Sequence, residues 1–578
     1  MENASIARIF ADMANICEIR GDNPFKIRAF RNAAAAIEAL PFDVKPLCAD
    51  PAKLREIKGI GDGMAKKIVE LCETGRLDEH QKLLAEFPPT LLELLEIEGV
   101  GPKKVALFHE KLGVKTLADL EAAARAGKVR DLPRVGAKNE EKILRSIEAH
   151  KQRAGRFLYS WAERAVERLV EMLRALPGVR RVEPAGAFRR RRETGGDLDL
   201  LVLCDDKGPV MERFCKAGET IAHGDTKCSV KLSSGIQADL RVVPAESFGA
   251  AMHYFTGSKQ HNIAIRSLAL KRGLTVNEYG VFRLLEDGKT TGERVGGATE
   301  EEVFAAVGLP WIPPELREDR GEIEAAFAGR LPKLLEPGEI RGDVHMHTTE
   351  TDGTASIEDM ALAAAEQGRT YIAITDHSKA LAFARGLDEA RLREHVARIR
   401  EADRKLAGKI RVLAGIEVDI LEDGSLDLAK DALAALDVVV GSVHSHFGLG
   451  RDEMTARIVR AIESDSIDIV GHITGRILLR RDPYALDMER IMAAAKAHGV
   501  ALEASAYPDR LDMSDVHCRM AKEHGVKVVI DTDSHATSHL ELMRYGVANA
   551  RRGWLEAGDV LNTRDCDDFL RLLHHGHR

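Results

Sequence analysis

The segment "GAFRRRRETGGDLDLLVL", residues 186–203, ends in a short apolar run that two aspartates interrupt. The run DLDLLVL is typical of a β-strand, so Asp197 and Asp199 face the same side. A second strand, "SGIQADLRVVP" at residues 234–244, carries Asp239. A carboxylate in an apolar strand is costly unless it is paired or binds a cation, and a solvated acidic strand edge would not explain the neighbouring glycines and arginines. We therefore predict that these three aspartates bind Mg²⁺ or Mn²⁺.

Phosphoryl transfer is the chemistry that such a site favours. Two metal ions held a few ångströms apart can stabilise both the attacking and the leaving oxygen. Gly186-Ala187 and Gly196 lie in turns close to the acids, and the arginines at 189–192 are suited to clamp a triphosphate. Asp197, Asp199 and Asp239 are therefore predicted to be catalytic residues.

The order Gly-Ala, arginine, Gly-Gly-Asp-x-Asp and a third aspartate resembles the nucleotidyltransferase palm of the family X DNA polymerases. The likeness continues through "YFTGSKQHNIAIRSLALKRGLTVNEYGVF" at 254–282, which is similar to the nucleotide-selecting subdomain, and it covers residues 1–317. Ala187 stands where many members have a serine, so one hydroxyl contact to phosphate is lost. The resemblance implies a template contact at Arg266 and nucleotide contacts at Gly186, Ala187, Arg190, Gly196, Arg241, Tyr254, Phe255, Gly257 and Asn262.

The amino-terminal third repeats a glycine turn followed by an amphipathic helix. The copies are "IKGIGDGMAKKI" at 57–68, "IEGVGPKKVALF" at 97–108 and "LPRVGAKNEEKI" at 132–143. Such turns present backbone N–H groups at a helix start, where phosphate is favoured, although ordinary helix–turn–helix packing is the alternative for any single copy. They resemble helix-hairpin-helix motifs, which bind the DNA backbone without reading sequence. The predicted DNA contacts are Gly59, Gly61, Lys66, Lys67, Gly99, Gly101 and Lys103.

The first domain also resembles the lyase domain of some family members. Lys67 aligns with the lysine that forms a Schiff base, and Lys26 with a phosphate-binding lysine. Phe30 and Phe25 replace the tyrosine and histidine of that pocket. A lyase activity is therefore left open, and a contact of Lys67 to backbone phosphate is the alternative.

Beyond residue 340, short apolar runs alternate with helical segments, and the runs end in potential metal ligands. "GDVHMHTTETDG" at 342–353 places His345 and His347 on one strand face. Alternating strands and helices predict a parallel sheet, and seven such units predict a barrel with active residues at the carboxyl ends of its strands. Further residues at such ends are Asp376, His377, Glu417, His444, His446, His472, Glu503, Asp533 and His535. Mixed imidazole and carboxylate ligands favour Mn²⁺ or Zn²⁺ over Ca²⁺.

This region resembles the polymerase-and-histidinol-phosphatase (PHP) domain, a metal-dependent phosphoesterase. The resemblance implies three ions, Mn²⁺ and/or Zn²⁺, and a 3′-end-processing nuclease, since bacterial family X polymerases carry this domain behind the palm. Incision at abasic sites, which some relatives perform, is left open. The implied ligands are His345, His347, Asp352, His377, Glu417, His444, His472, Asp533 and His535.

Composition sets the broad class. The chain has 578 residues, a formal net charge of -8 and 44% hydrophobic residues, which is typical of a multidomain globular protein. No apolar run approaches the roughly 20 residues that span a membrane, and no secretion signal is recognisable. The eight cysteines form no CxxC pair, which favours a reducing cytoplasm. We expect a cytoplasmic, nucleoid-associated monomer that binds gapped or primer-template DNA and a deoxynucleoside triphosphate, with no membrane partner.

The predicted fold is a multidomain one, with all-α hairpin regions, an α+β palm and an α/β seven-stranded distorted barrel. The expected activity is gap-filling DNA synthesis in base excision repair, combined with 3′–5′ exonuclease activity. The alternatives are a histidinol-phosphatase-like phosphoesterase and a DNA-binding scaffold with weak polymerase activity. The predicted boundaries are 1–85 and 86–150 for the two hairpin domains, 151–255 for the palm, 256–320 for the nucleotide-selecting subdomain, 321–340 for a linker and 341–578 for the PHP domain.

Overall fold

The chain forms two compact units, Met1–Ala154 and Gly155–Arg578. The computed structural model describes residues 3–38, 44–57, 59–97, 99–133, 135–153, 155–286, 290–381 and 384–573. Within these residues, no helix is both long enough and apolar enough to cross a membrane. The two units are described separately below.

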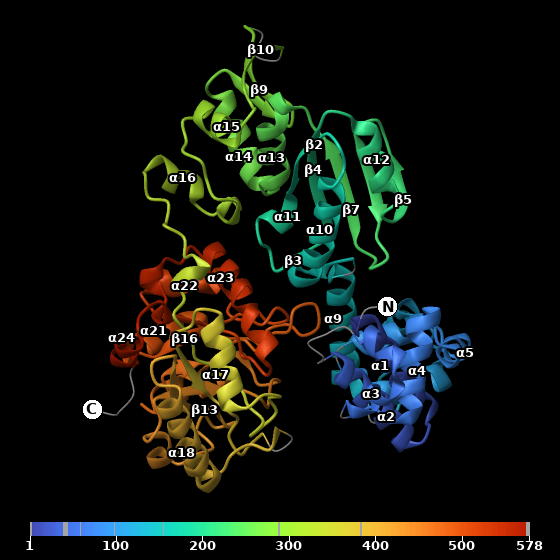
Figure 1. The fold of residues 1–578 in the computed structure, drawn as a ribbon, viewed down its shortest axis with the longest axis vertical. Helices are drawn as coiled ribbons and strands as arrows, with labels where there is room; N and C mark the ends of the chain where they lie inside the picture. The colour runs from blue at the N-terminus through green and yellow to red at the C-terminus, as the bar shows by residue number, and fades with distance from the viewer. Residues whose placement is uncertain are drawn as a thin grey trace. The chain divides into compact units, whose positions relative to one another are not determined.

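The first unit is entirely helical, and its helices bury two apolar cores in succession (Figure 1). The first core lies among α1 to α5, and the second lies mainly among α6 to α9. The helices are α1 Asn3–Arg20, α2 Pro24–Glu38, α3 Pro51–Glu56, α4 Asp62–Thr74, α5 Asp78–Glu86, α6 Pro89–Leu92, α7 Pro102–Leu112, α8 Leu117–Arg125 and α9 Gly136–Arg153, with 3-10 turns η1 Lys45–Ala49 and η2 Glu93–Glu96.

The glycine turns predicted from the sequence connect helices as expected. Gly59 has φ +101° between α3 and α4, and a Cβ there would lie 3.3 Å from the carbonyl oxygen of Asn32. Gly61 and Gly101 are the N-cap residues of α4 and α7, and no side chain caps either helix. The first N–H groups of both helices therefore lie at exposed glycine turns, as an anion site requires.

The second unit begins with a mixed five-stranded sheet of order β2-β4-β7-β6-β5. Along β4, Leu198 and Leu200 are buried on the face that α10 and α12 cover, so Asp197 and Asp199 project from the opposite face. Two short strands, β1 and β3, pair beside this sheet. The elements are β1 Phe157–Leu158, α10 Tyr159–Arg174, β2 Val179–Pro184, α11 Gly186–Arg189, β3 Thr194–Gly195, β4 Asp197–Cys204, α12 Lys207–Cys215, β5 Glu219–His223, β6 Lys227–Lys231 and β7 Gln237–Val242.

A helical pair and a three-stranded antiparallel sheet follow. Helices α14 and α15 pack on strands β8 and β9 around a common apolar core. The elements are η3 Ala245–Ser247, α13 Phe248–Thr256, α14 Lys259–Leu270, β8 Leu274–Asn277, β9 Gly280–Leu284, β10 Thr291–Gly296, α15 Glu300–Ala306, η4 Pro314–Leu316, α16 Glu322–Phe327 and η5 Pro337–Glu339.

The carboxy-terminal part is a seven-stranded parallel barrel, as predicted. The strands pair in chain order, and Met346, beyond β11, pairs with Ser534, beyond β17, which closes the ring. Helices surround the strands (Figure 1). The strands are β11 Gly342–Asp343, β12 Tyr371–Ile374, β13 Arg411–Asp419, β14 Val438–Ser442, β15 Ile469–Val470, β16 Ala501–Ser505 and β17 Val528–Asp531; the helices are α17 Ile357–Glu366, α18 Glu389–Lys405, α19 Lys430–Leu433, α20 Arg451–Ile462, α21 Met488–His498, α22 Asp515–His524, α23 Met543–Arg552 and α24 Cys566–Leu572, with 3-10 turns η7 Thr537–Leu542, η8 Ala557–Asp559 and η9 Leu561–Thr563.

Apolar side chains fill one end of the barrel. Phe569 of α24 is fully buried, and its ring centroid lies 5.2 Å from that of Tyr371 at the start of β12. Both belong to a core that Val344, Leu413 and Val529 share from inside the barrel. Because this end is filled, a binding site inside the barrel can form only at the other end, where the carboxyl ends of the strands lie.

The segment predicted as a linker, 321–340, is packed rather than free. Glu322 is fully buried and accepts a hydrogen bond from Nδ1 of His261 at 2.6 Å. Ile323 and Leu334 share an apolar core with α14 and α15, and Trp554, which follows α23, joins the same core. Proline and glycine in the sequence break helical periodicity here, but they do not prevent the segment from packing.

Polar contacts also join the barrel to the palm. The guanidinium of Arg552 donates to Glu318 Oε1 at 3.0 Å and to the carbonyl oxygen of Arg190 at 2.8 Å. Arg476, in the loop after β15, pairs with Glu193 just before β3 at 2.8 Å. Both arginines are at least nine-tenths buried, and the pair of Arg552 with Glu318 is shielded from solvent on both sides, whereas Glu193 is partly exposed.

His253 on α13 makes the stability of the region formed by α13 to α15 sensitive to acid. It is 2% exposed and packs against Phe304, and its burial, followed by the charges of Arg317 and His261, lowers its pKa well below its usual value. Below pH ~6.5 the unfolded state therefore binds a proton that the folded state excludes, and stability falls by about 1.4 kcal/mol per pH unit for this group. We expect His253→Leu to reduce the shift of the urea midpoint between pH 7.0 and 5.5, measured by tryptophan fluorescence.

The control for this experiment is His223→Gln, at an exposed position on β5. This variant should keep the wild-type shift of the urea midpoint. If His253→Leu also keeps the full shift, burial of His253 does not contribute to the acid sensitivity.

Candidate active sites

The sheet brings the predicted catalytic acids of the palm together. Strands β4 and β7 pair in parallel, with Asp199 directly opposite Asp239 and Asp197 opposite Gln237. Gln237 Nε2 donates to Asp239 Oδ1 at 3.2 Å, which orients that carboxylate. Paired positions on neighbouring strands lie roughly 5 Å apart, so all three carboxylates can reach the same ions.

The electrostatics of this group favour a bound cation. Burial, followed by the charges of Asp197 and Asp239, raises the pKa of Asp199 to about 7. Burial and the charge of Asp239 also raise the pKa of Asp197. Clustered carboxylates of raised pKa are stabilised in the ionised form when a divalent ion neutralises them. The arrangement therefore fits the predicted Mg²⁺ or Mn²⁺ site.

Gly186 is fitted closely against one of these acids. It starts α11 with φ +61°, and a Cβ built on it would lie 2.3 Å from Asp199 Oδ2. The next residue back, Ala185, donates its N–H to the carbonyl oxygen of Asp199 at 2.8 Å. The sequence predicted Gly186 as a nucleotide contact, and the structure adds that a larger residue would displace Asp199.

The arginines expected to clamp a triphosphate are already paired with glutamates. Arg190 is 9% exposed; it donates to Glu318 Oε1 at 2.9 Å and to the carbonyl oxygen of Thr256 at 2.7 Å. Arg189 forms an ion pair with Glu300 at 2.7 Å. The other two residues of the run also face glutamates, Arg191 at 3.5 Å from Glu315 and Arg192 at 3.6 Å from Glu318. A triphosphate would therefore have to compete with Glu318 for Arg190.

The remaining predicted nucleotide contacts gather where α13 meets α14. Asn262 Nδ2 donates to the carbonyl oxygen of Tyr254 at 2.7 Å, which fixes the intervening turn. A Cβ on Gly257 would lie 2.4 Å from Asn262 Oδ1, so the turn is tightly packed. The guanidinium of Arg241 lies over the ring of Phe255 at 4.5 Å. Arg266, the predicted template contact, is exposed on α14 one turn after Asn262.

In the first unit, Lys66 and Lys103 are exposed at the hairpins and free to meet phosphate. Lys67 and Lys26 both pair with Glu79, at 2.5 Å and 2.9 Å. The two lysines of the possible lyase site therefore share one carboxylate, which balances one of their two positive charges. Of the two phenylalanines that replace lyase residues, Phe30 is fully buried and Phe25 is 74% exposed.

In the barrel, the carboxylate of Glu417 is the centre of a ring of histidines. Its oxygens lie 2.7 Å from His377 Nδ1, 3.0 Å from His472 Nε2 and 3.2 Å from His444 Nε2. His345 Nε2 and His347 Nε2 are slightly farther from it, at 3.5 Å and 3.6 Å. Glu417 and these histidines would thus be among the residues that hold metal ions at this site.

The other predicted ligands complete overlapping groups around this centre. His347, Asp352, His377 and His535 form one group whose ligand atoms lie within 4.8 Å of one another, and a second group adds His345 and Asp533 to His347. All nine predicted ligands therefore converge at the carboxyl ends of the barrel strands. Glu417 and the imidazoles of His345, His347 and His472 are at least 98% buried.

Unsatisfied polar atoms show that this cluster fits metal ions. Within the described residues, His345 Nε2 and both ring nitrogens of His347 are buried and have no hydrogen-bond partner. Burial and the charges of His377 and His535 lower the pKa of His347 to about 4, so its imidazole is neutral and able to ligate at pH 7. Although burial alone would raise the pKa of Glu417, the imidazoles of His444, His377 and His345 hold it well below its usual value.

Two strand-end residues flagged in the sequence lie outside the ligand cluster. Asp376 accepts hydrogen bonds from the backbone N–H of Thr348 at 2.8 Å and from the hydroxyl groups of Thr348 and Thr351, and it faces His395 Nε2 at 2.8 Å. It therefore braces the loop that connects His347 to Asp352. His446 is half exposed and lies 3.4 Å from Glu422, away from the ligands.

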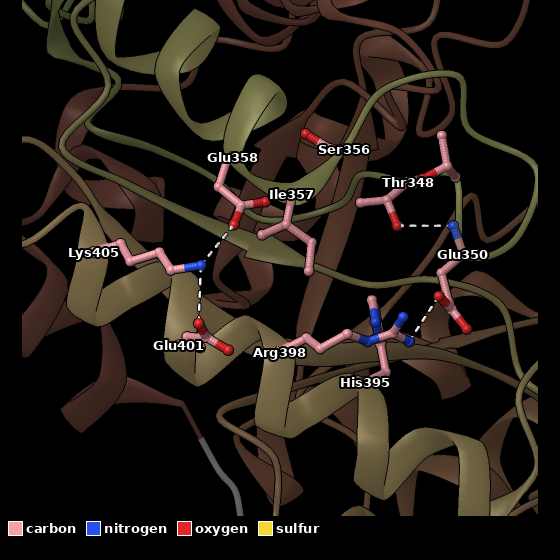
Figure 2. A pocket seen from close by; sticks show the side chains of 10 residues that line it. Thr348, Glu350, Ser356, Ile357, Glu358, His395, Arg398, Glu401 and Lys405 are labelled. Atoms are coloured by element: carbon pink, nitrogen blue, oxygen red, sulfur yellow. Dashed lines mark hydrogen bonds and ion pairs between the residues drawn. The ribbon is translucent and has the colours of Figure 1, made fainter.

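A polar cavity of about 290 Å³ lies behind this braced loop, between the loop, α17 and α18 (Figure 2). Its charged side chains are mutually paired. Figure 2 shows Lys405 between Glu358, at 3.8 Å, and Glu401, at 2.9 Å, and Arg398 facing Glu350 at 2.7 Å. The cavity therefore lies against the loop that Asp376 braces, which carries Asp352.

One supporting acid was missed in the sequence. His444 Nδ1 is hydrogen bonded to Asp419 Oδ1 at 3.0 Å, which leaves Nε2 directed at Glu417. Asp419 lies two residues after Glu417 on β13, so the period-two spacing of a strand already placed both carboxylates on one face. This two-residue spacing in the sequence could have identified Asp419.

Models of known families match four segments of the chain. They are a helix-hairpin-helix domain at residues 1–77, a SAM-like helix-hairpin-helix tandem at 91–149, a DNA polymerase beta thumb at 251–318 and a PHP domain at 343–506. The thumb match covers the α13 to α15 region, and the PHP match covers β11 to β16. Each match falls on a region with the corresponding secondary structure.

Similar proteins match either the whole chain or one part of it. The chain is 38% identical to "DNA polymerase/3′-5′ exonuclease PolX" of Bacillus subtilis (strain 168), over 99% of both chains. It is 26% identical to DNA polymerase lambda of Arabidopsis thaliana, over 54% of this chain and 62% of the relative. It is 28% identical to a probable phosphatase of Thermoanaerobacter sp. (strain X514), over 38% of this chain and 89% of the relative.

Gly186 offers a direct test of the palm geometry. We expect Gly186→Ala to lower nucleotide incorporation by about 100-fold or more, because its Cβ must move Asp199, and misplacing a metal-binding group by about 1 Å costs on that order. Single-nucleotide extension of a primer measures this. Gly235→Ala is the matched control, since Gly235 also has positive φ, +85°, but a Cβ there meets nothing within 4 Å. Equal losses in both variants would attribute the effect to backbone strain alone.

Proposed function

Because this chain belongs to the family X DNA polymerases of the type that carries a PHP domain, and is a DNA polymerase with 3′–5′ exonuclease activity, we propose that it fills short gaps in base excision repair. Synthesis would take place at the palm acids and 3′-end trimming at the barrel cluster. The observation that supports this most directly is that one chain contains both groups, the Asp199–Asp239 pair and the ligands around Glu417.

For synthesis, we propose Asp197, Asp199 and Asp239 as the catalytic residues that hold Mg²⁺ or Mn²⁺. Such ions, when bound, stabilise the attacking and leaving oxygens of the transferred phosphate. Strand pairing sets Asp199 opposite Asp239, with Asp197 two residues before Asp199 on the same face, and Gly186 leaves room for Asp199. The nucleotide contacts proposed with them are Gly186, Ala187, Arg190, Gly196, Arg241, Tyr254, Phe255, Gly257 and Asn262.

Gapped or primer-template DNA would be held mainly by its backbone. The hairpins offer exposed helix starts at Gly61 and Gly101, with Lys66 and Lys103 beside them. Contacts of this kind position DNA without reading its sequence. Arg266 on α14 is the proposed template contact, and Gly59 and Gly99 shape the turns.

We propose that Lys67 and Lys26 also contact DNA phosphate rather than act in a lyase reaction. A Schiff-base lysine must reach the sugar carbon with its amine, whereas Lys67 Nζ is held in an ion pair with Glu79 at 2.5 Å. Phosphate could replace Glu79 as the partner of both lysines. Abasic-site incision has no separate group of residues in the described structure to support it.

For the exonuclease, the proposed ligands are His345, His347, Asp352, His377, Glu417, His444, His472, Asp533 and His535, holding Mn²⁺ and/or Zn²⁺. Metal ions at this site would supply a nucleophilic hydroxide and polarise the phosphodiester. The mixture of imidazole and carboxylate suits these ions better than Mg²⁺, which prefers oxygen ligands and retained waters. The braced loop of Asp352 keeps that ligand in place when the 3′ end enters.

A phosphatase of small metabolites is less well supported. The similarity to a probable phosphatase extends over 38% of the chain, whereas that to the polymerase–exonuclease extends over 99%. The palm acids and hairpins also argue against a scaffold with weak polymerase activity. We further propose that the protein is a cytoplasmic, nucleoid-associated monomer. Light scattering with and without DNA would test whether it is a monomer.

The two sites can be separated by two substitutions. We expect Asp239→Ala to abolish gap filling, because it removes a metal-binding carboxylate, while 3′ trimming continues. His347→Ala should abolish trimming in Mn²⁺ and leave gap filling within a few-fold of wild type. Both activities are measured on one preparation, with a labelled primer on gapped DNA.

The matched controls are Asp225→Ala on the exposed β5–β6 turn and His446→Ala at the barrel edge. Neither should change either activity. Loss of both activities in either test variant, with wild-type circular dichroism, would contradict the assignment of two separate sites. Normal trimming by His347→Ala would contradict the metal assignment in the barrel.

A further inference from the structure

Glu503 is a buried carboxylate of the barrel that the proposed reaction does not use. It lies in the middle of β16, at the carboxyl end of the barrel strands, and is fully buried. The sequence flagged it among strand-end acids, but it is not among the nine proposed ligands. A buried carboxylate is retained at this cost only where its oxygens are well satisfied.

Both oxygens of Glu503 are occupied by groups from two different ligand segments. Oε1 lies 2.5 Å from Nδ1 of His345, which follows β11. Oε2 accepts a hydrogen bond from the backbone N–H of His472, which follows β15. One carboxylate on β16 therefore connects two proposed ligands that are far apart in the chain.

The contact with His345 decides which ring nitrogen can bind metal. A carboxylate accepts hydrogen bonds, so in the neutral imidazole, the form that binds a metal, Nδ1 of His345 carries the proton and Nε2 has the free lone pair. That Nε2 atom has no hydrogen-bond partner in the described structure and faces the cluster, 3.5 Å from Glu417 Oε1 and 3.8 Å from Asp533 Oδ1. The imidazole is thus held in the tautomer and orientation that ligation requires.

The contact with His472 holds a backbone that would otherwise be unfavourable. His472 has φ +24°, a region that residues with a side chain rarely adopt. Its ring is directed at Glu417, with Nε2 at 3.0 Å from Oε1. The hydrogen bond to Glu503 fixes the peptide that sets this direction.

We propose that Glu503 is a positioning residue of the metal cluster: it holds the His345 imidazole and the His472 backbone so that both ligands face the same ions. The inference rests on the proposed function of the barrel as a metal-dependent exonuclease. It differs from a ligand role, in which Glu503 would bind an ion together with His345 and Asp531, whose ligand atoms lie within 4.8 Å of its own. In that role His345 would have to turn Nδ1 to the metal, away from the cluster around Glu417.

Glu503→Gln separates these possibilities with almost no change in size. An amide has one acceptor oxygen and one NH₂ donor, whereas Glu503 faces two N–H donors. Either orientation of the amide therefore places a donor against a donor, at His345 or at His472. Loss of supporting hydrogen bonds around metal ligands typically lowers metal affinity by about 10- to 100-fold.

The experiment measures Mn²⁺ binding to the full-length protein by equilibrium dialysis and elemental analysis, with no DNA present. We expect Glu503→Gln to weaken Mn²⁺ binding by about 10- to 100-fold and to reach wild-type stoichiometry at higher Mn²⁺. Trimming should recover at the same higher concentration, and gap filling should stay unchanged. Recovery of full stoichiometry also shows that the variant barrel is folded.

Asp468→Asn is the matched control. Asp468 is equally buried in the same barrel and accepts a hydrogen bond from the backbone N–H of Val439 at 2.9 Å, away from the ligands. Its variant should bind Mn²⁺ as the wild type does. Unchanged affinity in Glu503→Gln, an equal loss in both variants, or a permanent loss of bound ions at saturating Mn²⁺ would each overturn the positioning role. If the wild-type protein binds Mn²⁺ but trims no 3′ ends, the exonuclease assignment fails while the affinity comparison still decides the role of Glu503.

Discussion

Parallel pairing of neighbouring strands is the constraint on which both reaction sites depend. It places residues that are distant in the chain at the same level, with their side chains on the same face. In the palm, this sets Asp199 opposite Asp239 although forty residues separate them. In the barrel, it delivers ligands from successive strand ends to one rim, while the packing around Phe569 fills the other end. The chemistry of each site follows from the sheet that carries it.

Strand pairing also brings ionisable groups of the same kind close together, which is energetically unfavourable. In the palm, burial and the charges of neighbouring carboxylates raise the pKa of Asp197 and Asp199, and in the barrel the imidazoles around Glu417 include buried nitrogen atoms without hydrogen-bond partners. Neither arrangement is stable by itself unless a cation or a proton compensates it. Supporting side chains such as Asp376 and Asp419 then limit the ways in which the ligands can rearrange.

Local patterns in the sequence predicted much of this. The alternation in DLDLLVL indicated the face of Asp197 and Asp199, and ligands recurring at strand ends indicated the closed barrel. Contacts over long distances in the chain were not predictable. The hydrogen bond from Arg190, which stays a proposed nucleotide contact, to Glu318, 128 residues away, is one example. The segment at 321–340 looked like a linker because of its prolines, yet it contributes Leu334 to an apolar core. Both contacts depend on residues that are distant in the chain, and the spacing of residues in the sequence does not indicate them.

The packing of Trp554 has a practical consequence for dividing the molecule. This tryptophan follows the barrel helix α23, yet it is 8% exposed because it belongs to the apolar core of α14 and α15. A fragment that starts at residue 341 would leave its indole uncovered and remove Glu318, the partner of Arg552. Arg552 would keep its ion pair with Asp515 at 2.8 Å, but the indole of Trp554 would form an exposed apolar patch, a surface that promotes self-association. A soluble nuclease fragment therefore depends on replacing Trp554 rather than on choosing a different starting residue.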